Sequence, residues 1–245
     1  MNHTVFFELC VETLEAGRAA EAGGADRIEL CSLLESGGVT PSVELVTGKL
    51  QALTIPVHVL IRPRAGNFCY SPEEFDRMCE QIEQARLAGA SGIAVGVLCG
   101  DRRVDVERTR TLVELARPMD VTFHRAFDET PDLCDSLERV IETGADSLLT
   151  SGGAANVLSG AESIGNLRRQ AGKRIQIIAG GGLRLDSLVE VVRRAGVYSL
   201  HGSLKRKNGK HESTRNGNAL ESDVREAIRL LRSEYRAALA PTPES

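Results

Sequence analysis

The sequence predicts an α/β protein built as a single TIM-type (β/α)8 barrel. Eight short apolar segments that suit β-strands alternate with helix-prone segments along the chain. Four of the helices end at a glycine just before the next strand, at Gly24, Gly89, Gly144 and Gly196. Strictly alternating units of this size favour parallel strands with right-handed crossovers, and eight of them can close into a barrel.

The strands are recognised by alternating apolar residues or by short apolar runs. They are expected over residues 6–10, 26–31, 56–62, 92–98, 121–124, 147–151, 174–179 and 197–201. The helices are expected over residues 12–22, 43–50, 71–88, 106–116 and 157–171, in segments that end at Thr143 and Ala195, and over residues 221–239.

Helix starts support several of these assignments. Residues 40–41, Thr-Pro, supply an N-cap followed by a proline suited to the first turn. Residues 71–74, Ser-Pro-Glu-Glu, have the spacing of a capping box, and residues 130–131, Thr-Pro, indicate another start. These signals place helices directly after expected strands.

The length of 245 residues allows one barrel or two small domains. We expect one domain over residues 1–240 and a loose tail over residues 241–245. The alternative, an open doubly wound sheet, usually carries a Gly-rich turn after its first strand, and residues 10–13, Cys-Val-Glu-Thr, are not one. Residues 205–218 are polar and without periodicity, which suits either a mobile lid or a disordered loop.

The composition excludes several classes of protein. A formal charge of −4 argues against a general nucleic-acid binder. No apolar run approaches the roughly 20 residues of a membrane span, and the first residues do not form a signal peptide. We therefore expect a cytoplasmic protein without membrane or nucleic-acid partners. The six cysteines include no Cys-x-x-Cys pair, so they should be reduced thiols.

Strand alternation predicts which side chains face the barrel interior. The apolar set should face the helices: Leu9, Ile28, Leu30, Val57, Val59, Ile61, Phe123, Ile175, Ile177 and Leu200. The opposite set should lie inside: Glu8, Cys10, Arg27, Glu29, Cys31, His58, Arg62, His124, Gln176, Ser199 and His201. Since charged side chains are seldom buried unpaired, Arg27 is expected to pair with Glu8 or Glu29.

Catalytic residues of such barrels lie at the C-terminal ends of the strands. Polar interior residues and the stretch 121–128, which ends in a cluster of ionisable groups, predict Glu8, Glu29, His124 and Asp128 as catalytic candidates. A structural alternative remains, in which His124 is a satisfied core histidine and Arg125 pairs with Asp128.

Small-residue turns follow the sixth, seventh and eighth strands, and their backbone N–H groups could approach a phosphate. Alternatively, the glycines are there only because a tight turn requires them. Nearby arginines could clamp a carboxylate or phosphate. The ligand-binding candidates are Arg62, Arg64, Arg125, Ser151, Gly181 and His201. They favour a small anionic, possibly phosphorylated, ligand.

Four segments resemble the CutC family of copper homeostasis proteins: residues 24–31 (GADRIELC), 61–68 (IRPRAGNF), 121–128 (VTFHRAFD) and 149–153 (LTSGG). The resemblance covers about residues 5 to 235. It implies a cytoplasmic TIM-type barrel that forms a homo-oligomer, a dimer or tetramer, and takes part in copper tolerance. It also implies copper(I) binding at Cys10 and Cys31. The chain departs from the usual family pattern at Ala65, where glycine is common, and at Asn67, where aspartate is common.

Two functional hypotheses follow. In the first, Cys10 and Cys31, at equivalent positions of adjacent strands and roughly 5 Å apart by strand spacing, bind copper(I), because soft thiolates select that ion. This pair is expected to be the only plausible metal site in the chain. In the second, the protein is an isomerase, lyase or hydrolase in which Glu29 or His124 moves a proton while arginines hold an anionic substrate.

Overall fold

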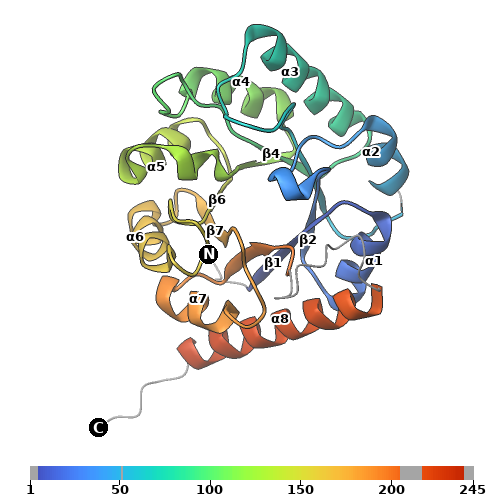
Figure 1. The fold of residues 1–245 in the computed structure, drawn as a ribbon, viewed down its shortest axis with the longest axis vertical. Coiled ribbons are helices and arrows are strands. Elements are labelled where there is room, and N and C mark those ends of the chain that lie inside the picture. Colours follow the sequence, from blue (N-terminus) through green and yellow to red (C-terminus); the bar gives the residue numbers. More distant parts are fainter. Residues whose placement is uncertain (1–4, 51, 205–216, 240–245) are drawn as a thin grey trace.

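The computed structural model describes residues 5–50, 52–204 and 217–239 and contains a closed barrel of parallel strands (Figure 1). The strands pair in chain order, and β8 closes the barrel against β1. Their bounds are β1 Phe6–Val11, β2 Arg27–Leu30, β3 Val57–Leu60, β4 Gly92–Val95, β5 Asp120–Phe123, β6 Ser147–Thr150, β7 Gln176–Gly180 and β8 Ser199–Gly202. The predicted (β/α)8 barrel is confirmed.

The helices form a ring around the strands, with the long α8 lying along α1 and α7 (Figure 1). They are α1 Leu14–Gly23, α2 Val43–Leu50, α3 Pro72–Leu87, α4 Val106–Ala116, α5 Leu133–Glu142, α6 Ala161–Ala171, α7 Leu188–Ala195 and α8 Gly217–Leu239; two short 3-10 helices are η1 Leu34–Ser36 and η2 Arg125–Glu129. Among the described helices, none combines the length and apolar character that a membrane span needs.

Some expected boundaries were wrong. The helix expected over 157–171 begins only at Ala161, because residues 151–160 fold back over the end of β6 and a side chain at Gly160 would collide with the Ser151 carbonyl. The last helix begins at Gly217, earlier than expected. Of the segment 205–218, residues 205–216 lie outside the described residues, as does the expected tail over 241–245.

The predicted alternation of side chains is confirmed. The apolar positions expected to face the helices all belong to one large buried core. A second, smaller apolar cluster contains Cys10, Cys31, Leu60 and Ala94, with Leu34 packed against it. Period-2 alternation thus separates a conventional helix-facing core from an interior that also carries polar groups.

Several of the interior polar groups are paired with one another. Glu8 lies against Arg27, one of the two pairings expected, and His201 Nδ1 lies 2.7 Å from Glu8 Oε1. Nearer the start of the strands, Gln176 Nε2 donates to Ser199 Oγ at 2.9 Å. Pairing offsets part of the desolvation cost of burying Glu8 and Arg27, whereas Gln176 is exposed at the start of β7.

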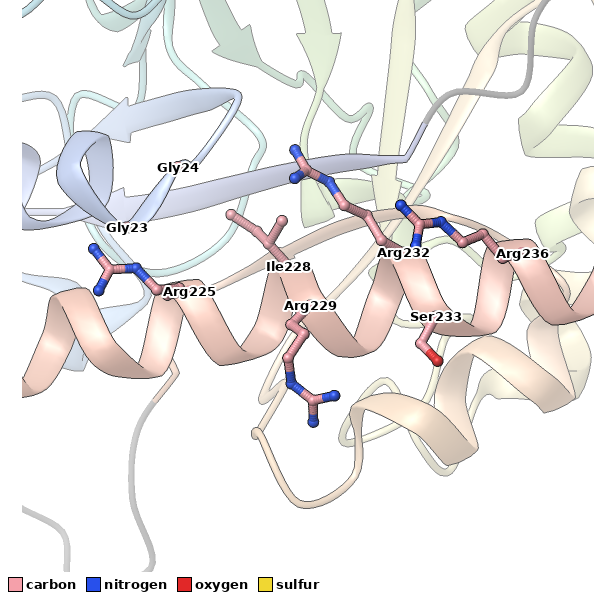
Figure 2. Close-up of a pocket in the computed structure, with 8 residues that line it drawn as sticks. All are labelled: Gly23, Gly24, Arg225, Ile228, Arg229, Arg232, Ser233 and Arg236. Carbon is pink, nitrogen blue, oxygen red and sulfur yellow. The ribbon is translucent and has the colours of Figure 1, made fainter.

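Helix α8 packs so closely on the end of α1 that glycine is required there. A methyl group at Gly23 would lie 2.7 Å from Cβ of Val224 and 2.9 Å from the carbonyl oxygen of Glu221. Beside this contact, four exposed arginines of α8 line a groove of about 480 Å³ (Figure 2); the lining is Gly23, Gly24, Arg225, Ile228, Arg229, Arg232, Ser233 and Arg236. Because Gly24 leads into β2, this groove lies at the N-terminal end of the strands.

His58 of β3 is buried inside the barrel. Gly92 of the neighbouring β4 makes room for it, since a side chain at Gly92 would collide with the imidazole ring. Both ring nitrogens are buried without a hydrogen-bond partner in the described part of the chain. Burial, reinforced by the charge of Arg27, lowers the pKa of His58 to about 3.

We expect Gly23→Ala to destabilise the protein. In an open helix this change would stabilise by about 1 kcal/mol, but overpacking against Val224 and a backbone carbonyl costs about 1–3 kcal/mol. Urea unfolding should therefore show a lower midpoint. Gly100→Ala is the control, because no atom lies within 4 Å of a methyl group there. Equal midpoints for the two variants would contradict the packing argument.

We also expect acid to destabilise the fold through His58. The pKa of His58 is about 3 in the folded protein, against an ordinary 6.5. Between these values only the unfolded chain binds this proton, so stability falls as the pH drops through that window. His58→Phe removes the titration, and its urea midpoint should fall less with acid than that of the wild type. Parallel pH curves for the two proteins would show that His58 does not contribute.

Candidate functional site

A cavity of about 630 Å³ opens at the C-terminal ends of the strands. Most of the predicted site residues line it: Cys10, Glu29, Arg62, His124, Arg125, Asp128, Gly181 and His201. The other four predicted site residues, Glu8, Cys31, Arg64 and Ser151, are not part of its lining. We call this cavity the mouth pocket.

Two thiols meet at the base of the mouth pocket. Cys10 Sγ and Cys31 Sγ lie 3.3 Å apart, and both residues are buried. The expectation that the two cysteines hold equivalent strand positions was wrong, because the register pairs Cys10 with Glu29 and the thiols meet diagonally across β1 and the end of β2. Of the two cysteines, Cys10 lines the pocket and Cys31 does not.

Glu29 and His201 bring further donor atoms to Cys10. One ligand atom from each of Cys10, Glu29 and His201 lies within 4.8 Å of the others, and Cys10 Sγ is 3.5 Å from Glu29 Oε1. A second candidate set of metal-ligating atoms thus lies beside the thiol pair, which was expected to be the only plausible metal site. The missed signal was barrel closure, which places the end of β8 against the end of β1.

The acids and His201 in this region influence one another. Burial alone would raise the pKa of Glu8, but Arg27 and His201 outweigh it and hold that pKa well below its usual range. Burial raises the pKa of Glu29, and the charge of Glu8 adds to the effect. Burial opposes the protonation of His201, yet Glu29 and Glu8 raise its pKa overall. The two carboxyl groups thus have opposite tendencies to ionise.

His124 forms another wall of the pocket. Its Nδ1 accepts a hydrogen bond from the backbone N–H of Ala126 at 3.2 Å, which caps η2. Its Nε2 is buried and has no hydrogen-bond partner among the described residues. Burial, followed by the charge of Arg62, lowers the pKa of His124 to about 3. The alternative in which His124 is a satisfied core histidine is therefore correct for Nδ1, which accepts a hydrogen bond, and wrong for Nε2, which has no partner among the described residues.

Asp128 already occupies the anion-binding turn after β6. Its carboxylate accepts from the backbone N–H groups of Ser151 and Gly153, each at 3.0 Å, and from the hydroxyl of Thr150. Arg125 Nε donates to it at 2.8 Å, as the structural alternative expected. The turn expected to hold a phosphate through Ser151 is thus used internally, and this occupation gives Asp128 a structural role.

The arginines are also largely engaged by the protein. Arg62 donates through Nη1 to the Gly38 carbonyl at 2.9 Å and through Nη2 to the Gly66 carbonyl at 2.7 Å. Arg64 is directed away from the pocket, with Nε 2.5 Å from Glu74 Oε1. Arg125 lies over Gly181, where a methyl group would be 2.8 Å from the guanidinium carbon. The structure therefore does not bring Arg64 to the site.

Comparisons with known proteins agree with this fold. The family model described as "CutC family" matches residues 5–206. A protein named as a family protein CutC from Caulobacter vibrioides is 43% identical over 201 residues, 82% of each chain. The human copper homeostasis protein cutC homolog is 41% identical over 198 residues, which are 81% of this chain and 72% of the human one.

Solved structures give the same result. A CutC crystal structure from Streptococcus agalactiae aligns with a TM-score of 0.78 at 29% identity, covering 82% of this chain and all of that one. Phosphoribosylanthranilate isomerase from Pyrococcus furiosus, at 17% identity and a TM-score of 0.59, shares the fold alone. On the family match, the identity to its relatives and the closed barrel, this chain belongs to the CutC family of copper homeostasis proteins.

Proposed function

We propose that the protein binds copper(I) through Cys10 and Cys31. The observation that carries the proposal is the buried pair of sulfurs 3.3 Å apart at the base of the mouth pocket. Thiolates are the soft ligands that copper(I) prefers. Their apolar surroundings, Leu60 and Ala94, limit access by water.

The nearby arginines do not oppose a cation at this position. Arg27 is paired with Glu8, and Arg125 is paired with Asp128. Arg62 donates to backbone carbonyls and lies over the Phe68 ring, 4.7 Å from its centroid. Because these charges are engaged by acids, carbonyl dipoles and an aromatic ring, the thiol pair remains a suitable metal site.

The cellular setting follows from the family resemblance. We propose a cytoplasmic location, where reducing conditions keep both thiols reduced. We also propose a homo-oligomer, a dimer or tetramer. Both remain predictions.

A second candidate function is catalysis on a small anionic metabolite, by an isomerase, lyase or hydrolase. The observation that favours it is the buried Nε2 of His124, which lacks a partner among the described residues in a wall of the mouth pocket. Burial raises the pKa of Glu29 in the same pocket, which favours the protonated form that a general acid needs. Arg125, whose side chain is 41% exposed, is placed to contact an anion.

For the copper proposal, we expect reduced wild-type protein to bind one equivalent of copper(I) in competition with a colorimetric chelator. Cys10→Ser and Cys31→Ser should each weaken binding by more than the roughly 10–100-fold that loss of an outer-shell partner costs. Cys134→Ser is the matched control, because that thiol is exposed at the start of α5. Unchanged stoichiometry and affinity in both test variants would remove the site.

For the enzyme candidate, inorganic phosphate should raise the wild-type Tm in a concentration-dependent way, as expected for a ligand that binds only the folded state. His124→Asn should abolish the increase, since asparagine can still cap η2 but lacks Nε2. Arg229→Gln, in the exposed groove of α8, should keep it. If phosphate and malonate both leave the wild-type Tm unchanged, the anion-binding proposal fails.

A further inference from the structure

The mouth pocket carries a second set of metal-ligating atoms that overlaps the thiol pair only at Cys10. A sulfur from Cys10, a carboxylate oxygen from Glu29 and an imidazole nitrogen from His201 lie within 4.8 Å of one another. The three residues are buried, with 3%, 5% and 8% exposure, and they come from three different strands. A mixed sulfur, oxygen and nitrogen set suits a borderline divalent ion such as Zn²⁺, whereas copper(I) prefers sulfur alone.

His201 is hydrogen-bonded to the carboxylate of Glu8, and histidines that bind a metal usually donate their other ring N–H to such a group. Its Nδ1 lies 2.7 Å from Glu8 Oε1. Arg27 binds the same carboxylate and keeps it ionised, so Glu8 can only accept and Nδ1 carries the proton. In the neutral ring, Nε2 is then left as the metal-binding atom. A carboxylate that fixes the tautomer of a ligating histidine is a common outer shell of zinc sites.

The distances are close to those of a tetrahedral site. With bonds of about 2.0 to 2.3 Å, ligand atoms around Zn²⁺ lie about 3.3–3.8 Å apart. Cys10 Sγ and Glu29 Oε1 are already 3.5 Å apart. The other separations, at most 4.8 Å, require a closing movement of about 1 Å, which side-chain rotation can supply.

From this arrangement we propose that Cys10, Glu29 and His201 form a binding site for a divalent cation of the Zn²⁺ or Co²⁺ class. A thiolate and a carboxylate balance the charge of the ion, while Glu8 and Arg27 balance each other. Three protein ligands leave a fourth position toward the mouth pocket, which is the pattern of catalytic rather than structural zinc sites. The site shares Cys10 with the proposed copper(I) site but does not depend on copper(I) binding.

Co²⁺ is the probe for the test, because its visible absorption reports tetrahedral geometry and its thiolate charge-transfer band reports sulfur ligation. Reduced, metal-free wild-type protein should bind one equivalent with both signatures, and Zn²⁺ should displace it. Glu29→Gln and His201→Gln each remove a direct ligand and should weaken Co²⁺ binding by more than the roughly 10–100-fold that loss of an outer-shell partner costs. Cys31→Ser should leave Co²⁺ binding unchanged, and so should the control Cys134→Ser, whose thiol is exposed at the start of α5.

The same variants separate this site from the copper(I) site. Cys31→Ser should lose copper(I) but keep Co²⁺, while Glu29→Gln and His201→Gln should keep copper(I) but lose Co²⁺. Circular dichroism checks that each variant is folded. The proposal is overturned if wild-type protein lacks the thiolate band, or if Cys31→Ser abolishes Co²⁺ binding while the other two variants retain it.

A measurement on wild-type protein keeps the proposal testable even if a variant does not fold. X-ray absorption of the Zn²⁺-loaded protein should show one sulfur ligand with nitrogen and oxygen ligands. Two sulfur ligands would place the ion on Cys10 and Cys31 and exclude the mixed site. This result is independent of whether the protein binds copper(I).

Discussion

The buried charge of Glu8 is the constraint on which the polar interior of the barrel depends. Its residue is 1% exposed, and a carboxylate in that position is costly unless it is paired and hydrogen-bonded. Arg27 supplies one partner from β2 and His201 supplies the other from β8. Because β8 adjoins β1 only in a closed barrel, strand closure and the satisfaction of this charge depend on each other.

This arrangement also orients the chemistry above it. The bond to Glu8 turns His201 so that it can serve the mouth pocket together with Cys10 and Glu29. The opposite wall carries His124 and Arg125, which suit an anion. One cavity of about 630 Å³ thus offers soft and borderline metal donors on one side and anion donors on the other.

Several residues that suggest anion binding in the sequence instead stabilise the mouth. Asp128 accepts the backbone N–H groups of Ser151 and Gly153 in the turn after β6, so these donors are not left for a ligand phosphate. Arg62 joins the loops after β2 and β3 through carbonyls such as those of Gly38 and Gly66. Arginines and glycines at strand ends are therefore ambiguous until their partners are known, because a protein carboxylate and a ligand phosphate use the same donors.

The sequence by itself determined the barrel, the direction of the strand side chains and the meeting of Cys10 with Cys31. These features depend on local periodicity and on the neighbour relation of consecutive strands, both of which can be read along the chain. The tertiary structure decided which partners meet: Glu8 with His201, 193 positions apart, and Asp128 with the turn after β6. Such pairings depend on barrel closure and loop paths, which no local pattern encodes, and for this reason the mixed donor set of Cys10, Glu29 and His201 was found only in three dimensions.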